Sequence, residues 1–235
     1  MSGWKAKRFW KTVAVTSDAD GFAIKLDARP LRTPAKAALI APTQAMAEAI
    51  AAEWQAVDAT VDPRRMPVTR AANAAIDKVA AQFNEVAELI AAYGGSDLLC
   101  YRAEAPESLT AAQGLAWDPY LDWAAQSLGA PLRTTRGIAP VAQPADSLHR
   151  LAEQVHQCTN FQLTALHDLV SLTGSLVLGL AATTSSFDPE TLWRVSRFDE
   201  GWQSEQWGED EDASAMAEIK REDFLRARYF WKLSS

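Results

Sequence analysis

The sequence predicts an α+β protein, with a small β-rich N-terminal domain over residues 1–65 and a larger all-helical C-terminal domain over residues 66–235. Three observations lead to this prediction. Apolar residues alternate in the first segment, as in strands, and recur every three or four positions in most of the later chain, as in helices. Two prolines within residues 62–67 mark a boundary between the two patterns. A chain of 235 residues is long enough to give both parts a core.

The N-terminal domain is expected to contain a hairpin and one helix. Apolar residues alternate on both sides of the turn-forming sequence DADG within residues 13–26, which is typical of two antiparallel strands joined by a tight turn. Thr43 can cap a following helix. In that helix Met46, Ile50 and Trp54 recur every four residues and form one apolar stripe.

The C-terminal domain is expected to consist of helices separated by connections that contain glycine or proline. The expected helical segments cover residues 68–93, 106–129, 145–158, 160–182, 188–208 and 213–233. Pro119 is expected to interrupt the second of them, because proline has no N–H for the helical hydrogen bond. Asp188 followed by Pro189 is a typical helix start and begins the fifth.

Charge and apolar content exclude several classes of protein. A net charge of −7 and a pI near 5.0 argue against a nucleic-acid-binding protein, which needs a basic face. The longest apolar stretch, residues 169–182, is too short to span a bilayer, so we expect no membrane insertion. Because the N-terminal segment lacks the apolar run of a secretory signal, the predicted location is the bacterial cytoplasm, or the mitochondrial matrix if the gene is eukaryotic.

The sequence lacks the motifs of nucleotide and metal chemistry. The glycines of GSLVLG at residues 174–179 have no lysine after them, and we expect them to let neighbouring helices approach closely. His149 and His156 are separated by about 10.5 Å of helical rise, too far to share one ion from one helix. Cys100 and Cys158 form no CxxC pair, and Cys100 is expected to be buried. We therefore expect no cofactor and no metal.

The carboxylates of residues 188–207 leave two interpretations open. On one continuous helix Asp199 would lie about 20° from Leu192, inside an apolar stripe. It could then form a structural ion pair, or it could act with Glu200 or Glu205 in a small acid/base hydrolase or lyase. The candidate arginine partners for the ion pair are Arg102, Arg194 and Arg197.

The acidic run EDED at residues 209–212 follows Trp207 and Gly208. Glycine is a usual helix stop, so these acids are expected at the start of the final helix, where the helix dipole favours negative charge. Four adjacent acids exceed what the first turn needs, and the surplus repels itself unless a cationic partner meets it. An exposed tryptophan beside surplus acids indicates a surface that binds another protein.

Several phrases of the sequence together resemble one family. TQAMAEAIAAEWQ, MPVTRAANAAID, SDLLCYRAEAPESLTAAQGLAWDPYLDWA and WQSEQWGEDED occur in this order, and the resemblance extends from about residue 8 to the C-terminus. They resemble the chaperone family that assembles the F1 sector of ATP synthase in mitochondria and alphaproteobacteria. The resemblance implies a non-enzymatic protein, monomeric when free, that binds the free alpha subunit of the F1 ATPase and prevents its aggregation until the beta subunit replaces it.

The resemblance also suggests which residues bind and which support the fold. The partner-binding residues it implies are Trp202, Glu205, Trp207, Glu209, Asp210 and Glu211. Among these Glu211 is assigned as the functionally important acid. The architectural motif residues it implies are Trp54, Asp97, Tyr101, Arg102, Trp117, Asp118 and Trp123.

Overall fold

The structure is a computed structural model that describes residues 7–208 and 210–235. The chain forms two compact units. The first contains the residues up to Phe83 with Thr159–Ala165 and Tyr229–Ser235, and the second contains Asn84–Cys158 and Leu166–Arg228. The N-terminal part contains strands and the rest is mostly helical, so the predicted α+β class is confirmed. The domain boundary at residue 65 stays a prediction, because compactness does not show which segments fold on their own.

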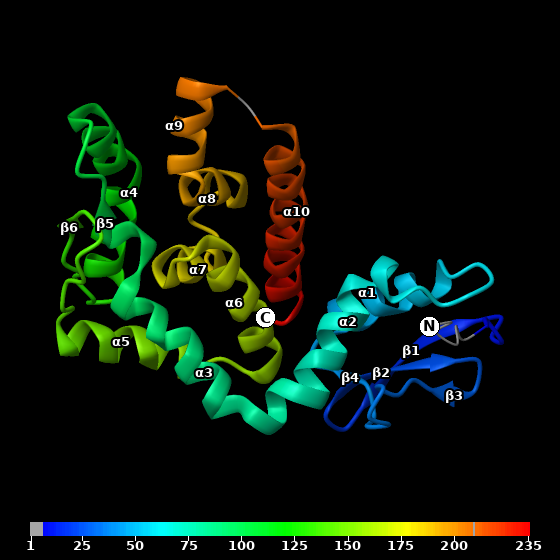
Figure 1. The fold of residues 1–235 in the computed structure, drawn as a ribbon. Helices are drawn as coiled ribbons and strands as arrows, with labels where there is room; N and C mark the ends of the chain where they lie inside the picture. The colour runs from blue at the N-terminus through cyan, green and yellow to red at the C-terminus, as the bar shows by residue number, and fades with distance from the viewer. Residues whose placement is uncertain (1–6, 209) are drawn as a thin grey trace. The chain divides into compact units, whose positions relative to one another are not determined.

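The first unit contains a small antiparallel sheet (Figure 1). Strands β1 (Val13–Asp18) and β2 (Gly21–Leu26) pair around the predicted turn, and the expected hairpin is confirmed. Strands β3 (Arg29–Pro30) and β4 (Ile40–Ala41) both pair with β2. Gly21 has a φ of +146°, and a Cβ there would lie 2.3 Å from a backbone oxygen of β4, so only glycine fits this position.

Helix α1 (Gln44–Gln55) packs against this sheet through the predicted apolar stripe. The hydroxyl oxygen of Thr43 accepts a hydrogen bond from the backbone N–H of Met46 at 3.1 Å and caps the helix. Met46 and Ile50 are fully buried in the core of the unit, and Trp54 packs against that core while half-buried. The cap and the stripe expected from the sequence are therefore confirmed.

A carboxylate of α1 fixes the start of the next helix. After a 3-10 turn η1 (Pro63–Arg65), Glu53 accepts hydrogen bonds from the backbone N–H groups of Val68 at 2.7 Å and Thr69 at 2.8 Å. These are N–H groups that have no partner within helix α2 (Pro67–Ala74). The helical path continues through η2 (Ala75–Val79), η3 (Ala80–Gln82) and α3 (Phe83–Ala91).

In the second unit, helix α4 does not break at Pro119. After η4 (Ala92–Ser96), η5 (Leu98–Cys100) and strand β5 (Tyr101–Arg102), α4 runs without interruption over Glu107–Ser127. The expected interruption was wrong. Buried residues on both sides of the proline, Trp117 and Leu121 among them, anchor the helix in the second core, and this packing outweighs the lost hydrogen bond.

The helix expected over residues 160–182 is two helices. Strand β6 (Thr135–Arg136) pairs with β5, and α5 (Ala145–His156) precedes α6 (Asn160–Thr173) and α7 (Leu176–Thr183). The break lies at Gly174, whose φ is +70°. Gly179 lies against Val170, where a Cβ would be 2.4 Å from the valine side chain. The expected close approach of helices at this glycine is confirmed.

Three further helices complete the second unit (Figure 1). They are α8 (Pro189–Ser196), α9 (Phe198–Trp207) and α10 (Glu211–Leu233). The last residues of α10, from Tyr229, belong to the first unit. Among the described residues, none of the helices combines the length and the apolar character needed to cross a bilayer.

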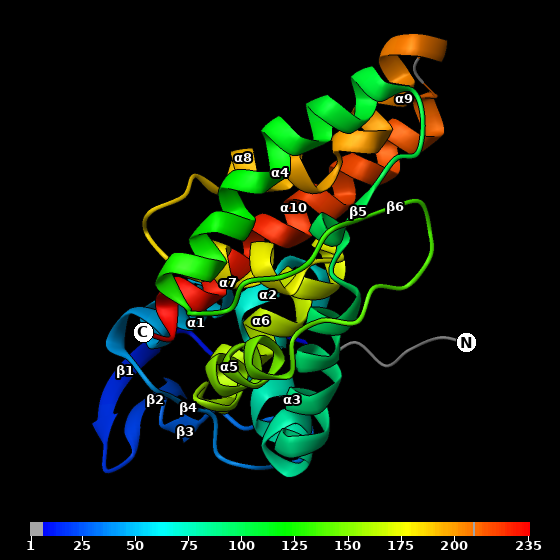
Figure 2. The same cartoon turned by 90° about the vertical axis from the view of Figure 1, so that its left-hand side faces the viewer.

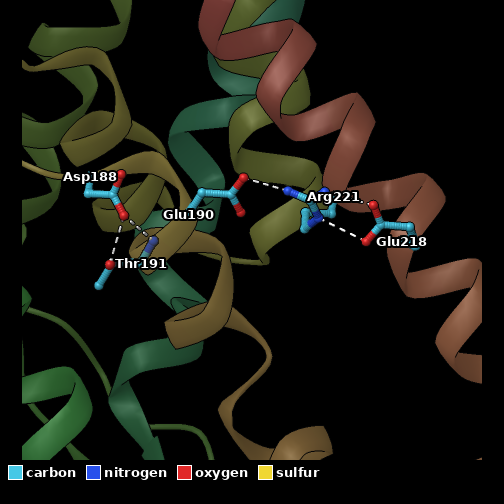
Figure 3. A network of polar contacts seen from close by, with 5 residues as sticks. All are labelled: Asp188, Glu190, Thr191, Glu218 and Arg221. Atoms are coloured by element: carbon cyan, nitrogen blue, oxygen red, sulfur yellow. Dashed lines mark hydrogen bonds and ion pairs between the residues drawn. The ribbon is translucent and has the colours of Figure 1, made fainter.

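A polar network connects α8 to α10 (Figure 3). Asp188 accepts hydrogen bonds from the backbone N–H and the hydroxyl of Thr191, both at 2.9 Å, and caps α8 as expected. Arg221 of α10 donates to Glu190 of α8 and, at 2.7 and 2.8 Å, to both carboxylate oxygens of Glu218. One guanidinium thus holds two helices together by charge-assisted hydrogen bonds.

Candidate partner-binding surface

The segment that carries the predicted site is not one helix. Residues 188–207 divide into α8 and α9 at Arg197, whose φ of −106° and ψ of 21° depart from helical values. The indole N–H of Trp117 donates to the carbonyl oxygen of Val195 at 2.9 Å, an oxygen that a continuous helix would use for Asp199. The expected position of Asp199 inside the stripe of Leu192 was therefore wrong, because the stripe does not continue across the break.

Asp199 is held by an amide. Its carboxylate oxygen accepts a hydrogen bond from the side chain of Gln113 at 2.8 Å. Arg102, one of the expected partners, instead pairs with Asp118 and donates to the backbone oxygen of Gln113 at 3.1 Å. The ion pair expected for Asp199 is thus replaced by a hydrogen bond that joins α9 to α4.

The acids that were considered as catalytic partners of Asp199 have other surroundings. Glu200 forms an ion pair with Arg197 at 3.1 Å, and Glu205 is exposed. Asp199 is half-buried. None of these three acids lines either of two hollows of the described residues, one beside Glu53 and Met66 and the other beside Leu115 and Asp122. A general acid with a raised pKa needs an apolar pocket, and neither hollow supplies one to these acids.

Helix α9 ends in an exposed tryptophan. Trp207 is 79% exposed, whereas Trp202, five residues earlier, is half-buried. Gly208 follows with a φ of +92°, which ends the helix in a conformation that favours glycine. A large aromatic side chain presented to solvent at a helix end is a suitable anchor for a protein partner.

The acids that follow have different roles. Glu209 lies outside the described residues. Asp210 accepts hydrogen bonds from the backbone N–H groups of Asp212 at 2.9 Å and Ala213 at 3.1 Å, so its side chain caps α10. Glu211 and Asp212 are exposed, and within the described part of the chain their side chains form no hydrogen bond or ion pair. They are the acids of this segment that remain available to a cation.

Two exposed apolar residues follow on α10. Met216 is 54% exposed and Ile219 is 53% exposed. They are three residues apart on the helix and therefore adjacent on its surface, and Asp212 lies one turn before Met216. Trp207, Glu211, Asp212, Met216 and Ile219 are hereafter called the α9–α10 surface.

Six of the seven motif residues that were expected to be architectural lie in or against the cores, whereas the Asp118 side chain is 60% exposed and pairs with buried Arg102. Asp97 is fully buried and accepts hydrogen bonds at 3.0 Å from the backbone N–H groups of Leu99 and Val177. Burial raises the pKa of its carboxyl, and these N–H groups act against that shift. The guanidinium of buried Arg102 lies 5.0 Å from the ring centre of Trp117, a cation–π contact. Tyr101 and Trp123 are half-buried against the same core.

The cysteines and histidines provide no reactive centre. Burial raises the pKa of the Cys100 thiol to about 12, so the thiol stays protonated near neutral pH and is a poor nucleophile. His156 contacts Glu88 at 3.2 Å and His149 contacts Glu153 at 3.2 Å. Within residues 7–208 and 210–235, no cluster of three or more His, Cys, Asp or Glu side chains is placed to hold a metal ion.

Two features of the site were missed from the sequence. Gln113 of α4 donates a hydrogen bond to Asp199, which is 86 residues away in the sequence. The spacing of neighbouring residues does not predict a contact over such a separation. Met216 and Ile219 could have been found, because an apolar pair at helical spacing lies on the otherwise polar face of α10.

Comparisons with known proteins identify the family. The model of the family described as ATP12 chaperone protein matches residues 7–125. The chain is 50% identical to Atp12 from Paracoccus denitrificans, covering 98% of this chain and 99% of that chain with a TM-score of 0.95. An aspartate-to-lysine mutant of P. denitrificans Atp12p matches at the same identity, over 98% of each chain, with a TM-score of 0.96.

The Atu1473 protein from Agrobacterium tumefaciens is also similar. It is 41% identical over 97% of this chain and 86% of that chain, with a TM-score of 0.91. The family that the sequence motifs resembled is therefore confirmed. On the family match and the near-complete coverage of these structures, the chain belongs to the ATP12 chaperone family.

Proposed function

We propose that this chaperone assembles the F1 sector of ATP synthase by binding the free alpha subunit and preventing its aggregation until the beta subunit replaces it. Membership of the ATP12 chaperone family supports a chaperone role. A subunit that lacks its neighbour exposes apolar surface, and large exposed apolar patches aggregate. The protein acts as a monomer, in the bacterial cytoplasm or in the mitochondrial matrix, without a cofactor.

The α9–α10 surface is the proposed contact, and its exposed tryptophan beside unpaired acids is the observation that carries the proposal. Trp207 provides aromatic area, while Glu211 and Asp212 provide negative charge at its edge. Interfaces are typically built in this way, with a few aromatic anchors inside a polar rim. Because Asp210 is engaged as a helix cap, Glu211 is the acid assigned to the client.

Glu205 and Trp202 are placed at the edge of this proposed surface. Glu205 is exposed on the same helix as Trp207, and Trp202, five residues before Trp207, is half-buried. The alternative of a small hydrolase or lyase has no comparable support, because Asp199 is bonded to Gln113 and Glu200 is paired with Arg197.

Glu211→Lys is expected to weaken association with the alpha subunit by about tenfold or more, because it places a positive charge where the client presents one. Trp207→Ala is expected to weaken it similarly through lost aromatic contact. Both side chains are exposed, so the circular dichroism and the melting temperature should change little. The measurement is co-purification of tagged alpha subunit from co-expressing cells, followed by a titration of the purified pair.

Asp146→Lys is the matched control, because Asp146 is also an exposed acid in the first turn of a helix of the second unit. The Asp146→Lys variant is expected to bind the alpha subunit as tightly as the wild type does. Equal binding by the wild type and Glu211→Lys would reject the assignment of Glu211. The absence of any complex with the wild type would reject the proposed function itself.

A further inference from the structure

A shallow hollow lies on the solvent side of α4, and its lining shares no residue with the α9–α10 surface. Its lining residues, hereafter called the α4 groove, are Ala111, Gly114, Leu115, Asp118, Pro119 and Asp122. The positions 111, 115, 118 and 122 follow the helical repeat and form one stripe. The opposite side of the same helix holds buried Gln113, Trp117 and Tyr120, so the groove lies on the face turned away from the core.

Leu115 gives the α4 groove an apolar wall. Its side chain is 84% exposed, the most exposed leucine among the large apolar residues of the described chain. A single exposed leucine is ordinary in any protein. Leu115, however, is followed on the stripe by two carboxylates. The groove therefore combines apolar surface with negative charge.

Asp118 is fixed at the groove by a buried arginine. One carboxylate oxygen accepts a hydrogen bond from Arg102, whose side chain is 7% exposed, whereas the Asp118 side chain is 60% exposed. The other oxygen lies 3.4 Å from the point where a Cβ on Gly114 would be, and thus over the floor of the groove. The carboxylate is therefore oriented in advance and presents a second oxygen to solvent.

Neither Pro119 nor Asp122 adds a donor to the groove. Pro119 has no backbone N–H, and its ring is apolar. Asp122 is exposed, and its side chain makes no hydrogen bond or ion pair within the described residues. None of the six lining side chains can donate a hydrogen bond when the two aspartates are ionised.

An apolar wall beside several acceptors fits one type of ligand group. Lysine and arginine carry N–H donors and a positive charge at the end of an aliphatic stem that packs on apolar surface. We propose that the α4 groove is a second contact site for the free alpha subunit and holds one basic side chain of that client. Its stem packs against Leu115, and its charged end lies between Asp118 and Asp122.

This inference rests on the proposed function, and the structure connects the two surfaces. Gln113 of α4 donates to Asp199 of α9 at 2.8 Å, so the helix that carries the groove is joined to the helix that carries Trp207 (Figure 2). Both helices belong to the second unit. The proposal therefore places both contacts of the client on this unit.

The test is a titration of purified alpha subunit with the wild type, Leu115→Ala and Asp122→Asn. Each substitution is expected to weaken binding by about tenfold, the effect of removing one well-placed interface contact. Asp122→Asn should also flatten the dependence of binding on salt, because it removes a charge, whereas Leu115→Ala should leave that dependence unchanged. Asp118 is left intact, because its loss would leave buried Arg102 without its partner.

Leu89→Ala and Glu153→Gln are the matched controls, since both residues are exposed on other helices of the same unit. Ala111→Phe, which fills the groove from an exposed position, is a second way to block it. Wild-type affinity in all three groove variants, with weakened binding by Glu211→Lys, would overturn the groove and leave the proposed function intact. No binding by the wild type would overturn both.

Discussion

Replacing Trp54 with arginine is expected to lower the free energy of unfolding by about 3–5 kcal/mol, comparable to the largest core truncations. The indole ring lies against Trp10, with ring centres 5.2 Å apart and planes at 60°, and packs on the core of the first unit. Arginine removes this aromatic contact and places a charge next to apolar residues. For a chain of this length the melting temperature should fall by about 10 °C, measured by circular dichroism.

Trp207→Arg is the control for this prediction. The change of residue type is identical, but Trp207 is 79% exposed at the end of α9. The melting temperature of this variant should stay close to that of the wild type, while client binding falls. A Trp54→Arg protein as stable as Trp207→Arg would show that Trp54 does not support the core.

Asp97→Ala is expected to cost about 3 kcal/mol or more, since it leaves two buried backbone N–H groups without an acceptor. The side chain is fully buried and connects η5 to the start of α7 through its hydrogen bonds to Leu99 and Val177. Alanine supplies neither acceptor and leaves a cavity. Urea unfolding should show a lower midpoint with an unchanged slope.

Asp188→Ala provides the comparison for Asp97. Asp188 also caps a helix through its carboxylate, but it is exposed, and water can replace the lost bond. Its loss of stability should be much smaller than that of Asp97→Ala. Equal losses for the two variants would contradict the importance assigned here to burial.

Sequence patterns correctly predicted the elements that depend on neighbouring residues, such as turns and helix caps. The alternation around residues 18–21, the cap at Thr43 and the Asp188–Pro189 start all formed as expected. The break at Gly174 had a readable signal, because glycine stops α6 and Ser175 then caps α7 by accepting from the N–H of Leu178 at 3.0 Å. One helix was nevertheless expected over residues 160–182, because the apolar residues continue on both sides of this glycine.

Long-range contacts set the features that the sequence did not predict. Pro119 stays within a helix because the buried residues on both sides of it hold α4 in the core, and α9 separates from α8 where Trp117 bonds to the Val195 oxygen. The acids were expected at the start of the final helix, and α10 begins at Glu211. Which acid caps a helix and which one is free depends on the geometry around Asp210, and sequence order does not specify that geometry.

The proposed chaperone role is tested most directly by the light scattering of purified free alpha subunit on warming, with and without an equimolar amount of this protein. The wild type is expected to suppress the scattering without added nucleotide. Glu211→Lys is expected not to suppress it, although that variant melts at nearly the same temperature. Scattering that rises equally with and without the wild-type protein would rule out this role.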